Sequence, residues 1–192
     1  MDVVEIDPVV IRVARDYFGT GHYPQLRSVA MDARRFVVST ETRYDVVIGD
    51  VYLGTTIPAH LITRELFDAV ARRLSDRGLY MMNVISAVKG PASSLFAAVM
   101  RTLTESFGAD AVHAFATVPE RPDQVQNLVL LASTARFDLS RLLREAERGR
   151  PSVARLLRTR LDWSQLEISG APVLTDQRSS AELLAARRRA TN

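Results

Sequence analysis

Hydrophobic and polar positions along the first 110 residues fall into blocks that predict strands and helices in alternation. Short apolar runs rich in Val and Ile predict buried strands, and apolar residues at helical spacing predict helices. The strands are expected at about 3–6, 26–31, 44–50 and 79–85, and the main helices at about 8–18, 61–74 and 92–107. This alternation predicts right-handed crossovers and a parallel sheet with helices on both faces.

The pattern changes twice after residue 107. Two β-prone runs, 111–118 and 127–132, follow each other with only the turn-rich 119–123 between them, which predicts an antiparallel hairpin at the sheet edge. From residue 136 onward the chain is rich in arginine and leucine at helical spacing. We therefore expect an α/β fold, with a Rossmann-like domain over residues 1–135 and a helical extension over 136–192.

The composition is that of an ordinary globular protein of 192 residues, with 47% hydrophobic and 24% charged residues. The formal net charge is only +3, and the run from Arg187 to Arg189 is typical of a solvated end, so no nucleic-acid partner is expected. No apolar run approaches the roughly 20 residues that span a bilayer, and no basic-then-apolar leader precedes the first strand. We therefore expect a cytoplasmic protein without a membrane partner. The absence of cysteine excludes disulfides and thiolate metal sites.

Acidic side chains follow three successive predicted strands, at the points where the strands end: Glu5 with Asp7, then Asp32, then Asp50. Ligands of open parallel sheets bind at the carboxyl ends of the strands. Carboxylates there suit an adenine nucleoside, because they accept hydrogen bonds from ribose hydroxyls and from an adenine amino group. A single acid in such a place is more often a helix N-cap, but three on consecutive strands favour a binding site. The histidines show no metal-ligand spacing, and no metal is expected.

Several stretches, in the expected order, resemble motifs of the spermidine synthase (polyamine aminopropyltransferase) family. They are Val4–Ile11 with Ala14–Phe18, Asp32–Phe36, Tyr44–Asp50, His60–Phe67, Leu79–Val84 and, later, Pro172–Asp176. The resemblance covers residues 3–132 and that later patch. It implies a Rossmann-like sheet of the S-adenosylmethionine-dependent methyltransferase type. It also implies S-adenosylmethionine, or its decarboxylated form, as a co-substrate and no tightly bound cofactor.

The resemblance also implies roles for particular residues. Glu5 would hold the ribose hydroxyls of the nucleoside, with Asp7 beside it in the same cofactor-binding motif. Asp32 and the backbone of Ala33 would meet the adenine, although the family more often has Gly in place of Ala33. The catalytic residue would be Asp50, beside the reactive sulfonium. The substrate-binding residues would be Tyr52, in the loop over the amine, and Asp176 in the C-terminal motif.

The chain departs from the family pattern at two places. The second strand-tip acid, which acts on the amine nucleophile in spermidine synthases, is replaced by Leu53. The glycine-rich loop and the first strand of the sheet, which should precede Glu5, are missing. Because the missing strand would leave unpaired strand edges, we expect a homo-oligomer or a partner that supplies the strand.

Three functions remain open at this stage. The first is transfer of an aminopropyl group from decarboxylated S-adenosylmethionine to a diamine. The second is methyl transfer from S-adenosylmethionine to an unknown acceptor, and the third is a non-catalytic scaffold or assembly subunit. The resemblance favours them in that order. Leu53 weakens the first and leaves the second open, whereas the missing loop and first strand favour the third for the isolated chain.

Overall fold

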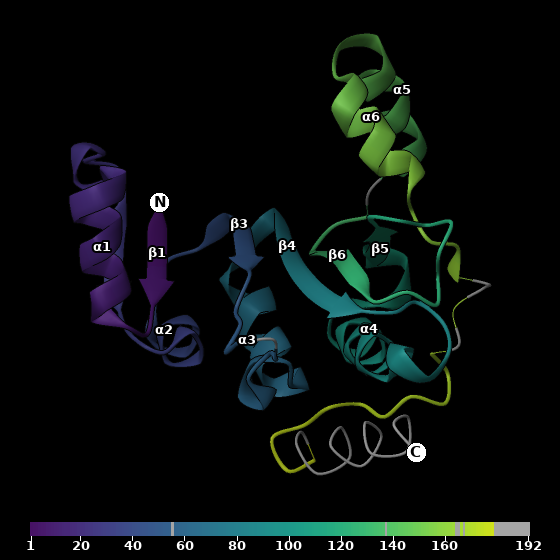
Figure 1. The fold of residues 1–192 in the computed structure, drawn as a ribbon, viewed down its shortest axis with the longest axis horizontal. Coiled ribbons are helices and arrows are strands. Elements are labelled where there is room, and N and C mark those ends of the chain that lie inside the picture. The colour runs from purple at the N-terminus through teal and green to yellow at the C-terminus, as the bar shows by residue number, and fades with distance from the viewer. Residues whose placement is uncertain (55, 137, 164–165, 167, 179–192) are drawn as a thin grey trace. The chain divides into compact units, whose positions relative to one another are not determined.

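The computed structural model describes residues 1–54, 56–136, 138–163, 166 and 168–178. It consists of two compact units, Met1–Thr42 and Arg43–Asn192 (Figure 1). The division falls inside the region predicted as one Rossmann-like domain, and the boundary at residue 135 stays a prediction.

The first unit contains two parallel strands, each followed by a helix. The elements are β1 (Asp2–Glu5), α1 (Pro8–Phe18), β2 (Arg27–Ala30) and α2 (Ala33–Ser39). The two strands pair in parallel over their whole length, as the alternating pattern predicts. Helix α1 begins with a proline in its first turn and ends at Gly19, whose φ of 68° is the left-handed conformation that glycine adopts most easily.

No described residue of this first unit is buried. Large apolar side chains are exposed, among them Ile6 at 69%, Tyr17 at 81% and Phe18 at 77%. This differs from the buried first strand that the sequence predicts. The physical reason is size, because two short strands and two helices cannot enclose a core by themselves.

The second unit contains a four-stranded mixed sheet of order β3-β4-β6-β5. Strands β3 and β4 are parallel, whereas β6 is antiparallel to both of its neighbours, so the predicted C-terminal hairpin is confirmed. The elements are β3 (Tyr44–Gly49), α3 (Arg64–Arg73), β4 (Leu74–Ser86), α4 (Ser94–Phe107), β5 (Val112–Ala116), β6 (Gln126–Ser133), α5 (Leu139–Gly149) and α6 (Pro151–Arg158).

The core of this unit lies between the sheet and the helix pair α3 and α4, which pack against each other and against β4. Its largest fully buried side chains come from both layers: Phe67, Phe96, Met100 and Leu103 from the helices, and Met82, Phe115, Leu128 and Leu130 from the strands. Burial of such side chains contributes roughly 1.5–3 kcal/mol each. The apolar pattern therefore predicts this core correctly.

Strand β4 is longer than predicted. It begins at Leu74, and its register against β3 shifts between Tyr44 and Val46, so that residues 75–78 form an irregular stretch inside the strand. The sequence predicts a turn at 76–78 and a strand only from residue 79. Gly78 explains the tight path, because an added Cβ would lie 2.9 Å from the backbone nitrogen of Ser75.

The two outer edges of the sheet differ. Residues 159–163 run along β5, where Leu161 N–H donates to Ala114 O at 2.8 Å and the Trp163 indole N–H donates to Val112 O at 3.1 Å. Strand β3 has only one ladder partner, β4, among the described residues. On β3, Val46 is 52% and Ile48 is 61% exposed. Among the described residues β3 is therefore an edge strand of this sheet, and the face that carries Val46 and Ile48 is exposed and apolar.

Helices α5 and α6 follow the sheet and form a hairpin (Figure 1). The described residues between 159 and 178 contain no α-helix, and the helical extension over 136–192 stays a prediction. None of the helices in the described part of the chain is long and apolar enough to cross a membrane.

Candidate functional site

The four predicted nucleoside-binding residues of the first unit share one edge of its sheet. Glu5 is the last residue of β1, and it pairs with Ala30 at the end of the parallel β2. Asp32 follows two residues later and Ala33 begins α2. Because the strands are parallel, their carboxyl ends meet at this edge.

Two of these acids cap the helices that follow them. Asp7 Oδ1 accepts a hydrogen bond from Val9 N–H at 2.7 Å, and Asp32 Oδ1 accepts one from Arg35 N–H at 2.9 Å. Glu5 Oε1 accepts a bond from Asp7 N–H at 2.8 Å, which turns the Glu5 side chain toward the start of α1. The carboxylates are therefore held by backbone groups at two helix N-termini, where partial positive charge favours anionic groups. Their role toward a nucleoside stays a prediction.

Asp50 lies at the corresponding edge of the second unit, directly after β3. Its Oδ1 accepts a hydrogen bond from Asn83 Nδ2 at 3.2 Å, across to the neighbouring strand β4. Tyr52 lies against the same strand: its hydroxyl donates to Asn83 O at 3.1 Å and accepts from Ile85 N–H at 2.9 Å. Burial raises the pKa of Tyr52, so its hydroxyl keeps the proton that it donates.

Asn83 is the residue that sequence reasoning missed. It is a polar side chain in the middle of the apolar run 79–85, and that position was the available signal. A buried or half-buried polar side chain needs a partner, and here the partner is the predicted catalytic carboxylate.

Asp176 lies at the N-terminus of α3, far along the chain from Asp50. Its N–H donates to Glu65 Oε2 at 3.1 Å. Leu174, two residues before Asp176, is fully buried, and its carbonyl accepts a hydrogen bond from Arg64 N–H at 2.8 Å. Because α3 follows β3, its N-terminus belongs to the edge at which β3 ends, and the Pro172–Asp176 motif is therefore attached to that edge of the second unit.

Leu53 is 77% exposed in the loop after Asp50. It stands where the family resemblance expects a second acid, and its backbone pairs with Thr56 in a short bridge. An exposed leucine offers a diamine neither a negative charge nor a proton acceptor.

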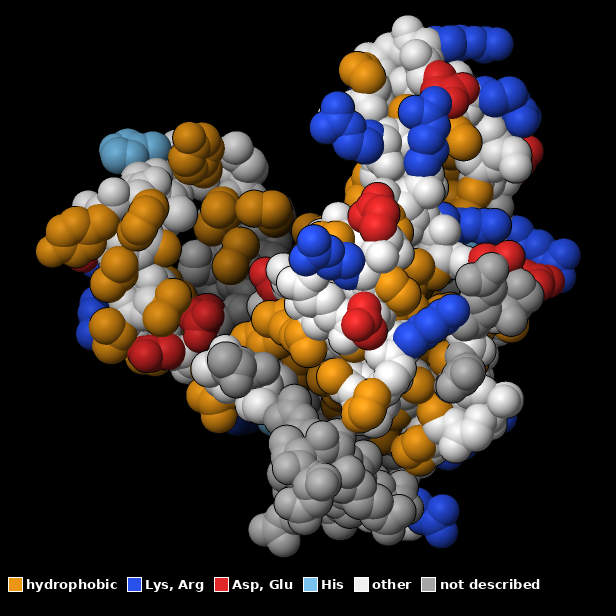
Figure 2. All heavy atoms as spheres, turned by 45° about the vertical axis from the view of Figure 1, so that its right-hand side comes forward, with side chains coloured by type: hydrophobic (Ala, Val, Ile, Leu, Met, Phe, Trp, Pro, Cys, Tyr) orange, Lys and Arg blue, Asp and Glu red, His pale blue; other side chains and the backbone are white. Residues whose placement is uncertain are grey.

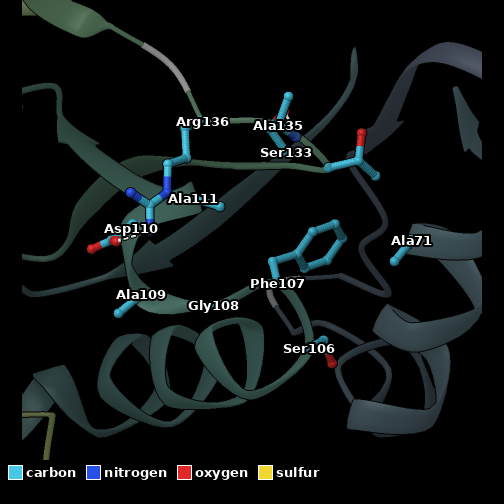
Figure 3. A pocket seen from close by; sticks show the side chains of 11 residues that line it. Ala71, Ser106, Phe107, Gly108, Ala109, Asp110, Ala111, Ser133, Ala135 and Arg136 are labelled. Atoms are coloured by element: carbon cyan, nitrogen blue, oxygen red, sulfur yellow. Dashed lines mark hydrogen bonds and ion pairs between the residues drawn. The ribbon is translucent and has the colours of Figure 1, made fainter. Parts of the chain in front are cut away.

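A cavity of about 530 Å³ lies at the opposite edge of the second unit's sheet, toward the amino end of β4 (Figure 3). Phe107 and the exposed pair Asp110 and Arg136, 2.9 Å apart, contribute to its walls. None of the predicted site residues lines it. Among the described residues, no group of three or more His, Cys, Asp or Glu side chains is arranged to hold a metal ion.

Alternating strands and helices, a C-terminal antiparallel pair and acids at the strand ends define the class of fold: a Rossmann-like sheet of the S-adenosylmethionine-dependent methyltransferase type. Solved structures agree. The chain superimposes on human methyltransferase-like protein 13 in complex with SAH with a TM-score of 0.60 and 20% identity, over 88% of this chain and 75% of that one. A probable spermidine synthase from Corynebacterium glutamicum gives a TM-score of 0.67 and 25% identity, over 91% of this chain and 63% of that one.

The family follows from the sequence. The model of the spermine/spermidine synthase domain matches residues 1–140, and the chain belongs to this family. A polyamine aminopropyltransferase from Vibrio vulnificus is 36% identical over 92 residues, which are 46% of this chain and 31% of that protein. An N-terminal histidine N-methyltransferase from Emericella nidulans is 29% identical over 141 residues, 70% of this chain and 24% of that protein. The chain thus spans less than a third of these two curated relatives.

Proposed function

We propose that this chain binds an S-adenosyl nucleoside through Glu5 and Asp32 and contributes Asp50 to the transfer of an aminopropyl group to a diamine. The observation that carries the proposal is the placement of Glu5 and Asp32 at the paired carboxyl ends of two parallel strands. The match to the spermine/spermidine synthase domain over residues 1–140 supports it. Both co-substrates are cationic, and carboxylates stabilise such charge.

In this proposal Asp50 acts through its charge and its fixed direction. The Asn83 amide holds one carboxylate oxygen from β4, so that the carboxylate needs little reorganisation when a cationic amine or sulfonium binds. Tyr52 fixes the start of the following loop by its two bonds to β4. The neutral amine nitrogen forms a bond to the carbon that leaves the sulfonium sulfur, the sulfur keeps the electron pair of the broken bond as a neutral thioether, and the proton of the new ammonium passes to solvent water. No covalent enzyme intermediate is required.

The test of nucleoside binding is a calorimetric titration of the chain with S-adenosylmethionine and with its decarboxylated form. Glu5→Gln and Asp32→Asn each remove a charged hydrogen-bond acceptor, which should cost about 1.5–3 kcal/mol, or about 10- to 150-fold in affinity. Glu41→Gln is the matched control, because Glu41 is exposed in the same unit but lies just before β3 and not at a strand's carboxyl end. Equal affinities for all four proteins would contradict the assignment.

A methyltransferase is the second candidate, and Leu53 is the observation that favours it. An exposed leucine in place of the diamine-directed acid predicts little or no spermidine synthesis by this chain alone. Mass spectrometry after incubation with putrescine and the decarboxylated donor measures this directly. Leu53→Asp should raise any spermidine formation, whereas efficient synthesis by the parent chain would refute the argument from Leu53.

The open edge of β3 supports a further part of the proposal, that a second copy or a partner chain adds a strand there. Such a strand would pair with the backbone of β3 on the side away from β4, and its own side chains would pack beside Val46 and Ile48 on the exposed face of the sheet. Light scattering across a dilution series should show self-association that weakens in Val46→Lys. A monomer at every concentration would contradict self-association in the absence of a partner.

A further inference from the structure

The hairpin of α5 and α6 carries a concentration of positive charge that the whole chain does not show. Residues 138–160 contain seven arginines and three acids, whereas the rest of the chain contains 18 basic and 19 acidic residues. The modest net charge of +3 is thus an average over a nearly neutral body and a strongly basic hairpin. Figure 2 shows the arginines standing out around the end of this hairpin.

All three acids of the hairpin already have partners. Glu145 pairs with Arg141 at 2.8 Å, and Glu147 pairs with Arg158. Asp138 caps α5 by accepting from the Arg141 backbone N–H at 2.9 Å. Near the turn between the helices, four exposed arginines therefore remain without an acidic partner among the described residues, and we call them the arginine cluster: Arg144, Arg148, Arg150 and Arg155.

The arginine cluster surrounds that turn. Arg148 and Arg150 flank Gly149 at the turn itself. Arg144 lies about 7.5 Å from Gly149 along α5, and Arg155 lies about 6 Å from the start of α6, at a rise of about 1.5 Å per residue. Four like charges within one and a half helical turns repel each other unless anions lie between them.

Helical periodicity separates the basic and the apolar surfaces of the hairpin. Ala146 is the buried residue of α5, and Arg144 and Arg148 lie about 160° away from it on either side, at about 100° per residue. The two arginines therefore occupy the outer face of α5. On α6, the exposed apolar side chains are Val153 at 40% and Leu156 at 45%.

The exposed side chains of the hairpin decide between partners. A helix that binds a membrane surface has a wide apolar face rich in Trp, Phe or Leu, whereas the large apolar side chains exposed on this hairpin are Leu142 at 39% on α5 and Val153 and Leu156 on α6, and none of them is aromatic. The centre of a protein interface is usually anchored by aromatic side chains, and residues 139–160 contain none. We propose that the arginine cluster binds the phosphate backbone of nucleic acid. Because contacts to phosphates carry no sequence information, this binding does not depend on base sequence.

Salt dependence is the quantity that tests the proposal. Four phosphate contacts on duplex DNA give a slope of about −3.6 in a plot of log K against log salt, so affinity should fall about 150-fold between about 50 and 200 mM salt. Arg144→Gln, Arg148→Gln and Arg150→Gln combined should leave a slope of about −0.9 and a fall of about threefold. Fluorescence anisotropy with two labelled duplexes of unrelated sequence measures both values.

The matched control removes the same charge elsewhere. Arg72→Gln, Arg77→Gln and Arg121→Gln combined change three exposed arginines of the second unit outside the hairpin and should keep the parent's slope. Circular dichroism verifies that both triple variants keep the fold. An equal loss in the two variants, or no binding by the parent at low salt, would overturn the proposal. So would binding to vesicles of anionic lipid that needs the cluster while neither duplex is bound.

Discussion

The backbone at Gly49 passes so close to Tyr80 that a side chain at position 49 would displace the tyrosine. An added Cβ would lie 2.5 Å from Tyr80 Oη and 3.1 Å from its Cζ. The tyrosine has little room to move, because its ring is buried between two phenylalanines. Its ring centroid lies 6.5 Å from that of Phe107, on which it stacks, and 5.9 Å from that of Phe67. Replacement of Gly49 by alanine should therefore destabilise the second unit.

The magnitude follows from two opposing effects. Overpacking of a close-packed core destabilises the folded state by about 1–3 kcal/mol. Alanine also lowers the conformational entropy of the unfolded chain relative to glycine, which stabilises the folded state by about 0.4–1 kcal/mol. The net loss for Gly49→Ala is about 1–2 kcal/mol, which at about 2–4 °C per kcal/mol for this chain length lowers Tm by about 2–8 °C.

Calorimetric unfolding of four proteins in a double-mutant cycle checks this cause. Tyr80→Phe removes the atom nearest to the added Cβ, so Gly49→Ala should cost less in the Tyr80→Phe background than in the parent. Gly149→Ala is the control, because no atom lies within 4 Å of its added Cβ, and it should not destabilise the protein. If the effects at positions 49 and 80 add without coupling, the close approach is not the cause.

Two further predictions concern titratable groups, the buried His113 and the half-buried Tyr52. His113 is 7% exposed, and neither of its ring nitrogens has a hydrogen-bond partner in the part of the chain that the structure describes. Burial together with Arg160 lowers the pKa of His113 below 6.5. The unfolded chain therefore takes up the proton first as the pH falls, so the stability of the folded chain should fall below about pH 6.5. His113→Leu should reduce the difference in thermal stability between about pH 7.5 and about pH 5, as thermal unfolding at these two pH values would show. Burial raises the pKa of Tyr52, so the unfolded chain loses that proton first and stability should fall as the pH rises above about 10. Tyr52→Phe should remove this loss of stability at alkaline pH and should lower the free energy of unfolding by about 1–3 kcal/mol near neutral pH. Urea titrations near neutral pH and above about pH 10 would measure both effects. An unchanged fall in the variant's stability above about pH 10 would contradict the prediction.

Features that depend on local chemistry could be predicted from the sequence. Asp7 caps α1 because a short acidic side chain before a helix reaches its first free N–H groups, and Gly19 ends the helix because it tolerates positive φ. The same local pattern predicts the strands and the hairpin at the end of the sheet. It also predicts the shared edge of Glu5 and Asp32, because parallel pairing aligns the carboxyl ends of the strands.

Features that depend on contacts between distant segments could not be predicted. The bond from Asn83 to Asp50 crosses between strands 33 residues apart, and periodicity contains no information on that pair. The exposure of Phe18 depends on how much chain surrounds it, which an apolar stripe alone does not reveal. Charge averaged over the chain conceals the arginine cluster, since the nearly neutral remainder dilutes it.

During synthesis the second unit cannot complete its hydrogen bonds until the Pro172–Asp176 motif has been made. Leu174 N–H donates to the Thr102 hydroxyl, 72 residues earlier, and Asp176 N–H reaches Glu65 across 111 residues. At about 5–20 residues per second, a ribosome needs roughly 5–20 s to make the chain from Glu65 to Asp176. Throughout that interval the start of α3 lacks this partner. From the synthesis of β5 until residues 159–163 have followed, β5 also lacks the segment that covers its outer edge. The nascent second unit therefore offers a chaperone first the uncovered edge of β5 and then, until the motif has emerged, the uncovered start of α3.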